Sequence, residues 1–212
     1  RGARIDSIMN GADDDGSGSM AVLELAEYLK ANPARRSIVL VWHAGEEKGL
    51  FGSGWFTDHP TVSRDSIVAQ INLDMIGRGS PADIPGGGPG YIQLIGSRRL
   101  STQLGDLVEA VNTTGKHGFS FDYQFDANGH PAQYYCRSDH YMYARYGIPV
   151  VFFSTGSHPD YHQVTDEPQY IGYEKYARVT SFVRDVARTV ANLDARPLVD
   201  HAKPDPKGQC KQ

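Results

Sequence analysis

Short runs of apolar residues alternate along the chain with longer segments in which apolar residues recur at helical spacing. Such continuous apolar runs are typical of buried parallel strands, and the expected strands are Ser37–His43, Ile67–Leu73, Tyr91–Ile95 and Pro149–Phe153. The expected helices are Gly18–Ala31, Trp55–His59, Ser101–Thr114, Asp139–Tyr146 and Tyr173–Leu193. The pattern predicts an α/β fold with a mostly parallel or mixed sheet flanked by helices on both faces.

Two stretches interrupt this alternation. Ser80–Gly90 is rich in glycine and proline, which indicates a surface loop. From Arg196 onward the chain is polar and dotted with prolines, so we expect a tail that packs loosely on the surface or is disordered. The predicted organisation is one domain over residues 1–195 followed by a polar tail over 196–212.

Composition and charge narrow the possible partners. The 212 residues carry a formal net charge of -4, and this gives no reason to expect nucleic acid, whose binding usually needs a basic surface. No apolar run approaches the roughly 20 residues that a membrane-spanning helix needs. Cys136 and Cys210 are the two cysteines. They would pair in an oxidising compartment, and free thiols are an equally good interpretation.

Four clusters of acidic residues and histidine stand near the expected strand ends. They are Asn10–Gly18 (NGADDDGSG), His43–Gly49 (HAGEEKG), Asn72–Gly77 (NLDMIG) and Asp160–Glu167 (DYHQVTDE). Ligands of open α/β sheets bind at the carboxyl ends of the strands, so these clusters are expected to converge. Carboxylates and imidazole together are suitable ligands for zinc.

Each cluster taken alone also has a purely structural interpretation. Asp13–Asp15 fits a solvated turn or the cap of a helix, and Glu46 with Glu47 fits a solvated loop. Asp74 fits a helix cap and His162 a surface histidine. Other sites have no support, because the EF-hand spacing fails and no H-E-x-x-H, G-x-S-x-G or phosphate-binding loop occurs.

In this order the clusters resemble those of the co-catalytic dizinc metallopeptidases. That family includes bacterial leucyl-type aminopeptidases, glutamate carboxypeptidase and the related glutaminyl cyclases. The matching segments are NGADDDGSGSMAVLELA, VWHAGEEKGLFGS, INLDMIG, CRSDH, YGIPVVFFSTG and DYHQVTDE, from residue 10 to about residue 195. The resemblance implies a zinc exopeptidase with a peptide substrate.

The resemblance also implies the ligands of two zinc ions. Asp14 matches the carboxylate that bridges the two ions. Glu47 and His162 match the other ligands of one zinc, and Asp74 matches a ligand of the second. Two such ions share a water, lower its pKa and polarise the scissile carbonyl group.

The remaining roles concern catalysis and substrate. Glu46 matches the general base, and Tyr161 resembles a residue that stabilises the oxyanion. Asp139 and His140 match a loop near the substrate end of the pocket. One glutamate of the Glu46–Glu47 pair would therefore bind metal while its neighbour handles protons.

One expected element is absent from this sequence. The family has an H-x-D motif upstream of the acidic cluster, and its histidine completes the second zinc site. Residues 1–9 read RGARIDSIM, and no histidine precedes His43. We therefore expect an N-terminally truncated chain that lacks the first strands of the sheet, with natural loss of the second metal as a rarer explanation. We expect one well-occupied zinc site and a weak or empty second site.

The expected function is removal of N-terminal residues from peptides by an aminopeptidase. Two alternatives stay open: a single-zinc acyltransferase like the glutaminyl cyclases, and a catalytically inactive relative that binds partners. The resemblance alone suggests a secreted or periplasmic protein.

Overall fold

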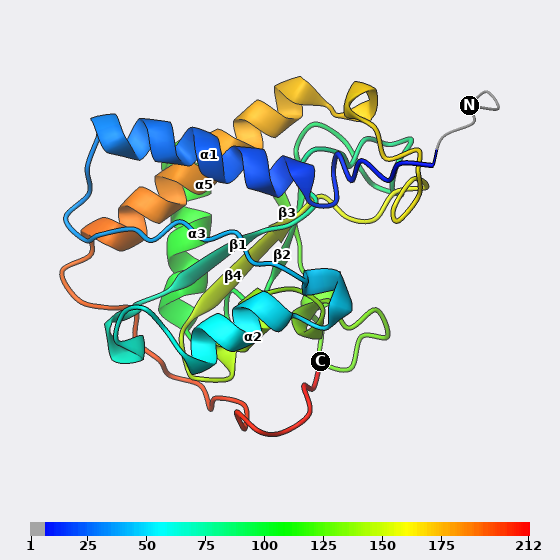
Figure 1. Cartoon of the computed structure of the whole chain (residues 1–212). Helices are drawn as coiled ribbons and strands as arrows, with labels where there is room; N and C mark the ends of the chain where they lie inside the picture. The colour runs from blue at the N-terminus through cyan, green and yellow to red at the C-terminus, as the bar shows by residue number, and fades with distance from the viewer. Residues whose placement is uncertain (1–6) are drawn as a thin grey trace.

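A four-stranded mixed sheet organises the fold in the computed structural model, which describes residues 7–212 (Figure 1). Its strands are β1 (Gln70–Leu73), β2 (Tyr91–Ile95), β3 (Ser120–Asp122) and β4 (Val150–Ser154), in the spatial order β1-β4-β2-β3. β1 is parallel to β4 and β2 is parallel to β3, whereas β2 and β4 are antiparallel. This confirms the expected α/β fold with a mixed sheet.

Helices cover both faces of the sheet, as expected. α1 (Gly16–Ala31), α3 (Thr102–Thr114) and α5 (Tyr173–Asn192) pack together on one face, while α2 (Phe51–Asp58) and α4 (His140–Ala144) lie on the other (Figure 1). Short 3-10 helices occupy Glu46–Lys48, Arg64–Ser66, Gln124–Asp126, Tyr134–Cys136 and Pro168–Tyr170. Within residues 7–212, no helix has both the length and the apolar character needed to cross a membrane.

Each face of the sheet has its own apolar core. The apolar stripe of α5, which includes Val179, Phe182 and Val183, is buried in the same core as Phe153. On the other face, Phe152 and Val150 pack against the aromatic residues of α4. All residues of β4 are buried because this strand lies between β1 and β2. The strand ends that carry the candidate site are therefore anchored by both cores.

The prediction of a strand at Ser37–His43 is wrong. The segment is extended but forms no strand pairing among the described residues, and Val39 and Trp42 are 56% and 51% exposed. A strand requires a hydrogen-bonded neighbour, and an apolar sequence alone does not supply one. In contrast, the short strand β3 was not predicted, because its three residues are too few to produce a visible alternation. α2 also begins at Phe51 rather than at Trp55.

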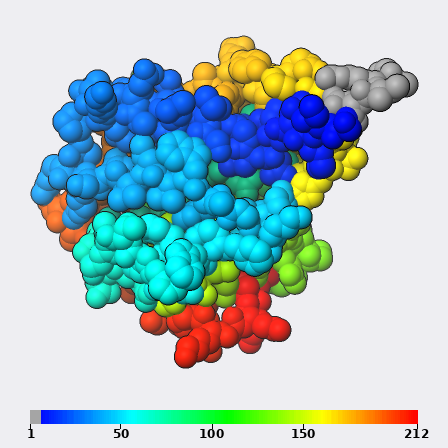
Figure 2. All heavy atoms as spheres, viewed as in Figure 1, coloured from blue at the N-terminus to red at the C-terminus, as the bar shows by residue number. Residues whose placement is uncertain are grey.

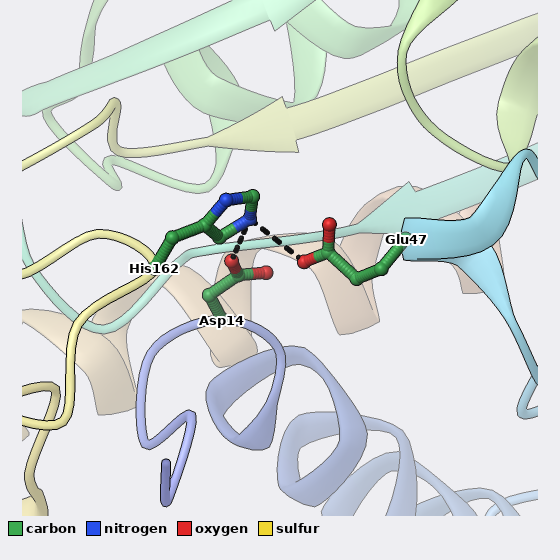
Figure 3. A group of neighbouring side chains, drawn as sticks. All are labelled: Asp14, Glu47 and His162. Atoms are coloured by element: carbon green, nitrogen blue, oxygen red, sulfur yellow. Dashed lines mark hydrogen bonds and ion pairs between the residues drawn. The ribbon is translucent and has the colours of Figure 1, made fainter.

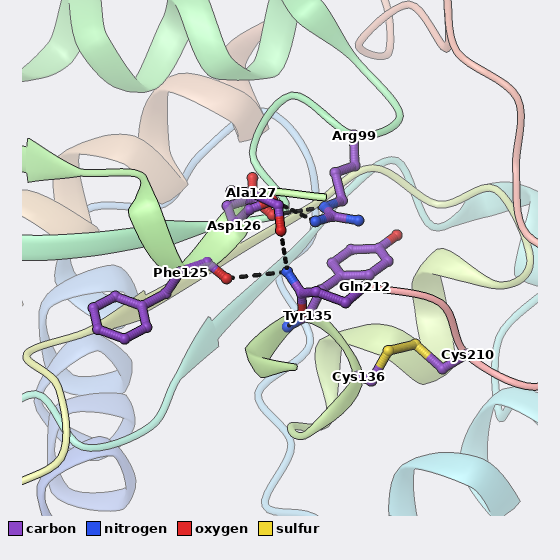
Figure 4. Close-up of a disulfide and its surroundings, with 8 residues drawn as sticks. All are labelled: Arg99, Phe125, Asp126, Ala127, Tyr135, Cys136, Cys210 and Gln212. Carbon is purple, nitrogen blue, oxygen red and sulfur yellow. Dashed lines mark hydrogen bonds and ion pairs between the residues drawn. A yellow bond between two sulfur atoms is a disulfide. The ribbon is translucent and has the colours of Figure 1, made fainter. Parts of the chain in front are cut away.

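The tail beyond Arg196 is irregular, yet its end is fixed to the domain. Cys210 forms a disulfide with Cys136, so the cysteines are paired (Figure 4). The side-chain Nε2 of Gln212 donates hydrogen bonds to the carbonyl oxygens of Phe125 and Ala127. The expected boundary between domain and tail stays a prediction, and the first six residues of that domain lie outside the described part of the chain.

Candidate metal centre

Three consecutive aspartates precede α1, and their side chains point in different directions. Asp15 caps the helix, because its Oδ1 accepts a hydrogen bond of 3.0 Å from the Gly18 amide. Asp13 is fully buried, whereas Asp14 is half-buried and faces the candidate site. Gly18 permits this packing, since a Cβ atom there would lie 2.4 Å from the Leu73 carbonyl oxygen. The helix-cap interpretation therefore holds for Asp15 alone.

Asp14, Glu47 and His162 come from three separate segments of the chain and form one cluster (Figure 3). The Nε2 atom of His162 lies 3.1 Å from Asp14 Oδ2 and 2.9 Å from Glu47 Oε1. One donor atom from each residue falls within a group whose members are all within 4.8 Å of one another. Two carboxylates and one imidazole with a free approach from solvent match an open zinc site of the catalytic kind.

Asp74 lies at the carboxyl end of β1, beside this cluster. Its Oδ2 accepts a hydrogen bond of 2.7 Å from the hydroxyl of Ser138, which in turn accepts one from the Asn72 side chain. Among residues 7–212, Asp14, Glu47 and His162 are the one group of three or more metal-binding side chains close enough to share an ion. Asp74 lies outside this group, so a second ion would have two donors, Asp74 and a shared Asp14.

The carboxylates of the site repel one another. Burial and the charges of Asp74 and Glu47 raise the pKa of Asp14 to about 8. Burial, followed by the charges of Asp74 and Glu47, raises the pKa of Glu46 to about 8. Burial also raises the pKa of Asp74 to about 6, although the Ser138 hydrogen bond opposes this. A divalent cation would offset this repulsion, so the donor set fits zinc electrostatically as well as geometrically.

Glu46 and Glu47 belong to the 3-10 helix Glu46–Lys48, which follows a left-handed turn at Gly45. The turn sends neighbouring side chains to different places, so Glu47 reaches His162 while Glu46 is half-buried beside it. Both line the pocket at the cluster. The separation of one metal-binding and one proton-handling glutamate is therefore geometrically feasible.

Tyr161 stacks on the ring of His162, with ring centroids 3.8 Å apart. Its hydroxyl accepts a hydrogen bond of 3.0 Å from the Arg137 guanidinium. Burial raises the pKa of Tyr161 to about 12, so the phenol keeps its proton at neutral pH. A protonated hydroxyl beside the cluster can donate a hydrogen bond to an oxygen that gains negative charge.

The two residues expected at the substrate end differ in their surroundings. Asp139 lines the pocket, and burial raises its pKa, with the Ser53 hydroxyl opposing the shift. His140 is fully buried, and its ring packs on Phe152 with centroids 4.8 Å apart. Its assignment to substrate binding stays a prediction, and in this structure His140 lies within the core rather than on the pocket wall.

A groove of about 940 Å³ leads to the cluster. It is lined by the Ser37–His43 segment, by β1 and by apolar residues of α1 and α5. Figure 2 shows this face, with the region around Ser37–His43 (light blue) between α1 (blue) and α2 (cyan). Asp14, Glu46, Glu47 and Asp74 all line the groove, so it opens onto the candidate metal centre.

Sequence reasoning missed the residues that support this centre. Arg137 and Ser138 lie in the CRSDH segment that carries the resemblance, but no role was predicted for them. Asp166 was also missed, although its buried carboxylate contacts the loop of Asp14. The sequence shows only that these residues are near Asp139 or His162 along the chain. This nearness does not indicate where a side chain points or which residue it contacts.

Comparisons with known proteins agree with this geometry. BSAP, a zinc aminopeptidase from Bacillus subtilis, superposes with a TM-score of 0.70 at 22% identity, covering 93% of this chain and 46% of that one. A glutaminyl cyclase from Porphyromonas gingivalis superposes with a TM-score of 0.61 at 22% identity, covering 86% of this chain and 64% of that one. These likenesses show the fold alone.

The sequence comparisons go further. Leupeptin-inactivating enzyme 1 from Streptomyces exfoliatus is 28% identical over 173 residues, which cover 79% of this chain and 34% of that protein. The curated relatives that this chain matches are thus much longer than the chain. The profile of peptidase family M28 matches residues 2–187, which is most of the sequence. With the ordered clusters and the matching fold, this match shows that the chain belongs to peptidase family M28.

Proposed function

We propose that this chain carries the catalytic centre of a zinc-dependent aminopeptidase that removes N-terminal residues from peptides. The observation that carries the proposal is the convergence of Asp14, Glu47 and His162 with Glu46 beside them at the mouth of the groove. Family membership supports hydrolysis of a peptide bond. The names of relatives such as the zinc aminopeptidase of Bacillus subtilis support zinc and the amino-terminal direction.

Asp14, Glu47 and His162 would hold the zinc ion, which supplies a Lewis acid and an acidified water when bound. Glu46 accepts a proton from the attacking water and transfers it to the leaving amine. This role needs an unprotonated carboxylate; burial and neighbouring acidic charges raise the pKa of Glu46 to about 8, and a cation held at the Asp14 cluster would lower it. The Glu46 carboxyl group therefore depends on its neighbours for its protonation state.

Tyr161 stabilises the oxygen that gains negative charge as water adds to the carbonyl carbon. Its hydroxyl already accepts a hydrogen bond from Arg137, which leaves its own proton available for that oxygen. Arg137 thereby orients the hydroxyl and contributes positive charge near the reacting group. Asp139, on the pocket wall, is suited to contact the positively charged amino terminus of a substrate.

The expected metal content is one tightly held zinc ion. Asp14, Glu47 and His162 supply three protein ligands, whereas Asp74 and Asp14 alone would hold a second ion. Three ligands and a water satisfy the tetrahedral preference of zinc, and two carboxylates do not. A second ion is therefore expected to bind weakly.

The disulfide between Cys136 and Cys210 supports a location outside the cytosol. Disulfides form and persist mainly in oxidising compartments. We propose a secreted or periplasmic protein, and fractionation of the producing cells, with detection of this chain by mass spectrometry, would test this. Recovery in the cytosolic fraction alone would contradict it.

An assay of two reactions tests the proposed activity. The zinc-loaded protein is given an aminoacyl-anilide and, separately, a peptide with an N-terminal glutamine. Release of aniline without cyclisation is expected. Cyclisation without hydrolysis would favour the single-zinc acyltransferase, a candidate that the single three-donor group keeps open. Neither reaction, with zinc bound, would favour an inactive relative.

A further inference from the structure

A buried carboxylate holds the backbone of the loop that presents Asp14. Both oxygens of Asp166 accept hydrogen bonds from the Asp13 amide, at 3.1 and 3.0 Å, and Oδ2 accepts another from the Asp14 amide at 3.0 Å. The Asp166 carbonyl oxygen accepts a bond of 3.3 Å from the Ala12 amide. Asp166 is 1% exposed, so these contacts are shielded from water.

Asp166 also belongs to the segment that carries His162. Its own amide donates to the Gln163 carbonyl oxygen at 3.1 Å, which folds the chain back just after the histidine. One side chain thus joins the loop of Asp14 to the loop of His162. Successive backbone N–H groups that point at one carboxylate form charge-assisted hydrogen bonds, which are stronger than neutral ones.

The buried side chain of Asp13 makes the corresponding connection on the other side. Its Oδ1 accepts a hydrogen bond of 2.6 Å from the amide of Gly77, which lies in the loop that begins with Asp74. Its Oδ2 lies 3.3 Å from His158 Nε2, at ion-pair distance but without the alignment of a hydrogen bond. Asp13 therefore touches both the loop after β1 and the loop after β4.

We propose that Asp13 and Asp166 are positioning residues that fix the Asp14 carboxylate relative to His162 and Asp74 before a metal ion binds. Neither side chain is placed to bind the ion itself, since both are turned into the protein behind the cluster. The inference rests on the proposed function in that the cluster is taken to bind zinc. Its physical basis is preorganisation: ordering the loops during folding removes that cost from the binding step.

The loss of metal affinity expected on removing such a positioning residue can be estimated. Groups that orient metal ligands typically contribute about 10- to 100-fold to metal affinity. Asp166→Asn keeps the size of the side chain but replaces one acceptor oxygen with an N–H donor. With its oxygen at the Oδ2 position, the asparagine still accepts from both amides, but its N–H group then stands at the Oδ1 position, 3.1 Å from the Asp13 amide. The lost charge and this contact between two donors loosen the loop, and Asp14 moves with it.

Zinc affinity measured by competition with a chromophoric chelator tests the proposal without an activity assay. Asp166→Asn is expected to weaken zinc binding about 10- to 100-fold. The matched control is Asp126→Asn, which removes another largely buried carboxylate whose partner is Arg99 and which lies away from the ligand loops. The control is expected to keep the wild-type affinity. Wild-type affinity in Asp166→Asn would overturn the proposal.

Thermal unfolding with and without zinc separates positioning from general stability. A residue with only a structural role would lower the unfolding temperature equally in both states. A positioning residue reduces the rise in unfolding temperature that zinc produces, because that rise depends on affinity. An unchanged rise in Asp166→Asn or in Asp13→Asn would assign that residue a structural role only.

A measurement on the wild-type protein covers the case in which the variants do not fold. The amides of Asp13 and Asp14 should exchange slowly with deuterium in the metal-free protein, because Asp166 already binds them. Fast exchange that slows only after zinc is added would show that the metal orders the loop, and would overturn the proposal. A wild-type protein that binds no zinc, yet shows slow exchange, would instead refute the proposed function.

Discussion

The two sides of β1 differ in how the neighbouring chain is held. On one side, β4 pairs with β1 along its length and is buried from Val150 to Ser154. On the other side, the equally apolar Ser37–His43 segment pairs with no described strand and exposes Val39 and Trp42. Similar sequences therefore differ in structure because one has a hydrogen-bonded neighbour and the other faces a groove.

The residues of the candidate metal centre also differ in how firmly the surrounding chain holds them. Asp14 is anchored by Asp166, while Asp74 is anchored by Ser138 at the end of the paired strand β1. Glu46 and Glu47 follow the unpaired segment, and the Glu47 side chain is 51% exposed. Asp14 and Asp74 are thus held by hydrogen bonds from other parts of the chain. The turn that carries Glu46 and Glu47 is held mainly by its own local hydrogen bonds.

The largest expected effect is on the glutamate turn. Glu46→Gln removes the proton acceptor without changing size, so hydrolysis of an aminoacyl-anilide should fall about 10²- to 10⁴-fold. Zinc affinity should be retained, because Glu46 is not one of the three clustered donors. Glu174→Gln, an exposed glutamate on α5, is the control. Equal activity of the two variants would show that Glu46 does not handle the proton.

A pair of truncations compares the two sides of β1 directly. Phe153→Ala removes a fully buried ring from β4 and should cost about 3–5 kcal/mol in the free energy of unfolding. Val39→Ala removes exposed methyl groups and should change it by less than about 0.5 kcal/mol. Urea denaturation measures both. A cost at Val39 as large as that at Phe153 would mean that the Ser37–His43 segment is packed like a paired strand.

The disulfide should matter next most. Cys136 and Cys210 are 74 residues apart, and their link restricts the unfolded chain. Replacing both with serine should lower the free energy of unfolding by about 2–4 kcal/mol. Denaturation of the oxidised wild type and of the double variant, both without reductant, gives the comparison. No loss of stability would show that the other contacts of the tail suffice.

The smallest effect concerns acid stability. Burial lowers the pKa of His140 from 6.5 to about 3, so the unfolded chain takes up a proton there while the folded protein does not. Stability is therefore lost as the pH falls from about 6.5 toward 3. At pH 5 the loss due to His140 should be about 2 kcal/mol.

His140→Leu removes this titration. Metal-free wild type and variant are unfolded in urea at pH 8 and at pH 5, and the decrease between the two should be about 2 kcal/mol smaller in the variant. The same decrease in both proteins would mean that His140 is protonated in the folded state, and that its surroundings are wetter than the structure indicates.

Sequence patterns predicted the helix and the strand whose apolar side chains form the core. The apolar stripe of α5 and the apolar run of β4 each need other apolar groups to cover them, so both patterns predict burial in the core. Ser37–His43 carries the same type of pattern, but pairing depends on a neighbour that this pattern cannot identify. The resemblance implied Asp14, Glu47 and His162 as metal ligands through the order of the motifs, and the structure brings the three side chains together.

Sequence patterns could not predict the roles of the residues that support the candidate metal centre. Asp13, Asp14 and Asp15 are chemically identical in the sequence, and only the fold turns one into the core, one toward the metal centre and one onto the helix end. Asp166 is distant from Asp14 along the chain, so their contact requires tertiary structure. These roles depend on direction, which composition and spacing do not determine.

One complete set of zinc ligands, Asp14, Glu47 and His162, is proposed for this chain. The most direct test is native mass spectrometry, supported by elemental analysis, of the protein after zinc loading and dialysis against a weak chelator. One zinc ion per chain is expected in the wild type and none in His162→Ala. Two tightly bound ions per chain would contradict it, because Asp74 would then have donors beyond the Asp14, Glu47 and His162 group.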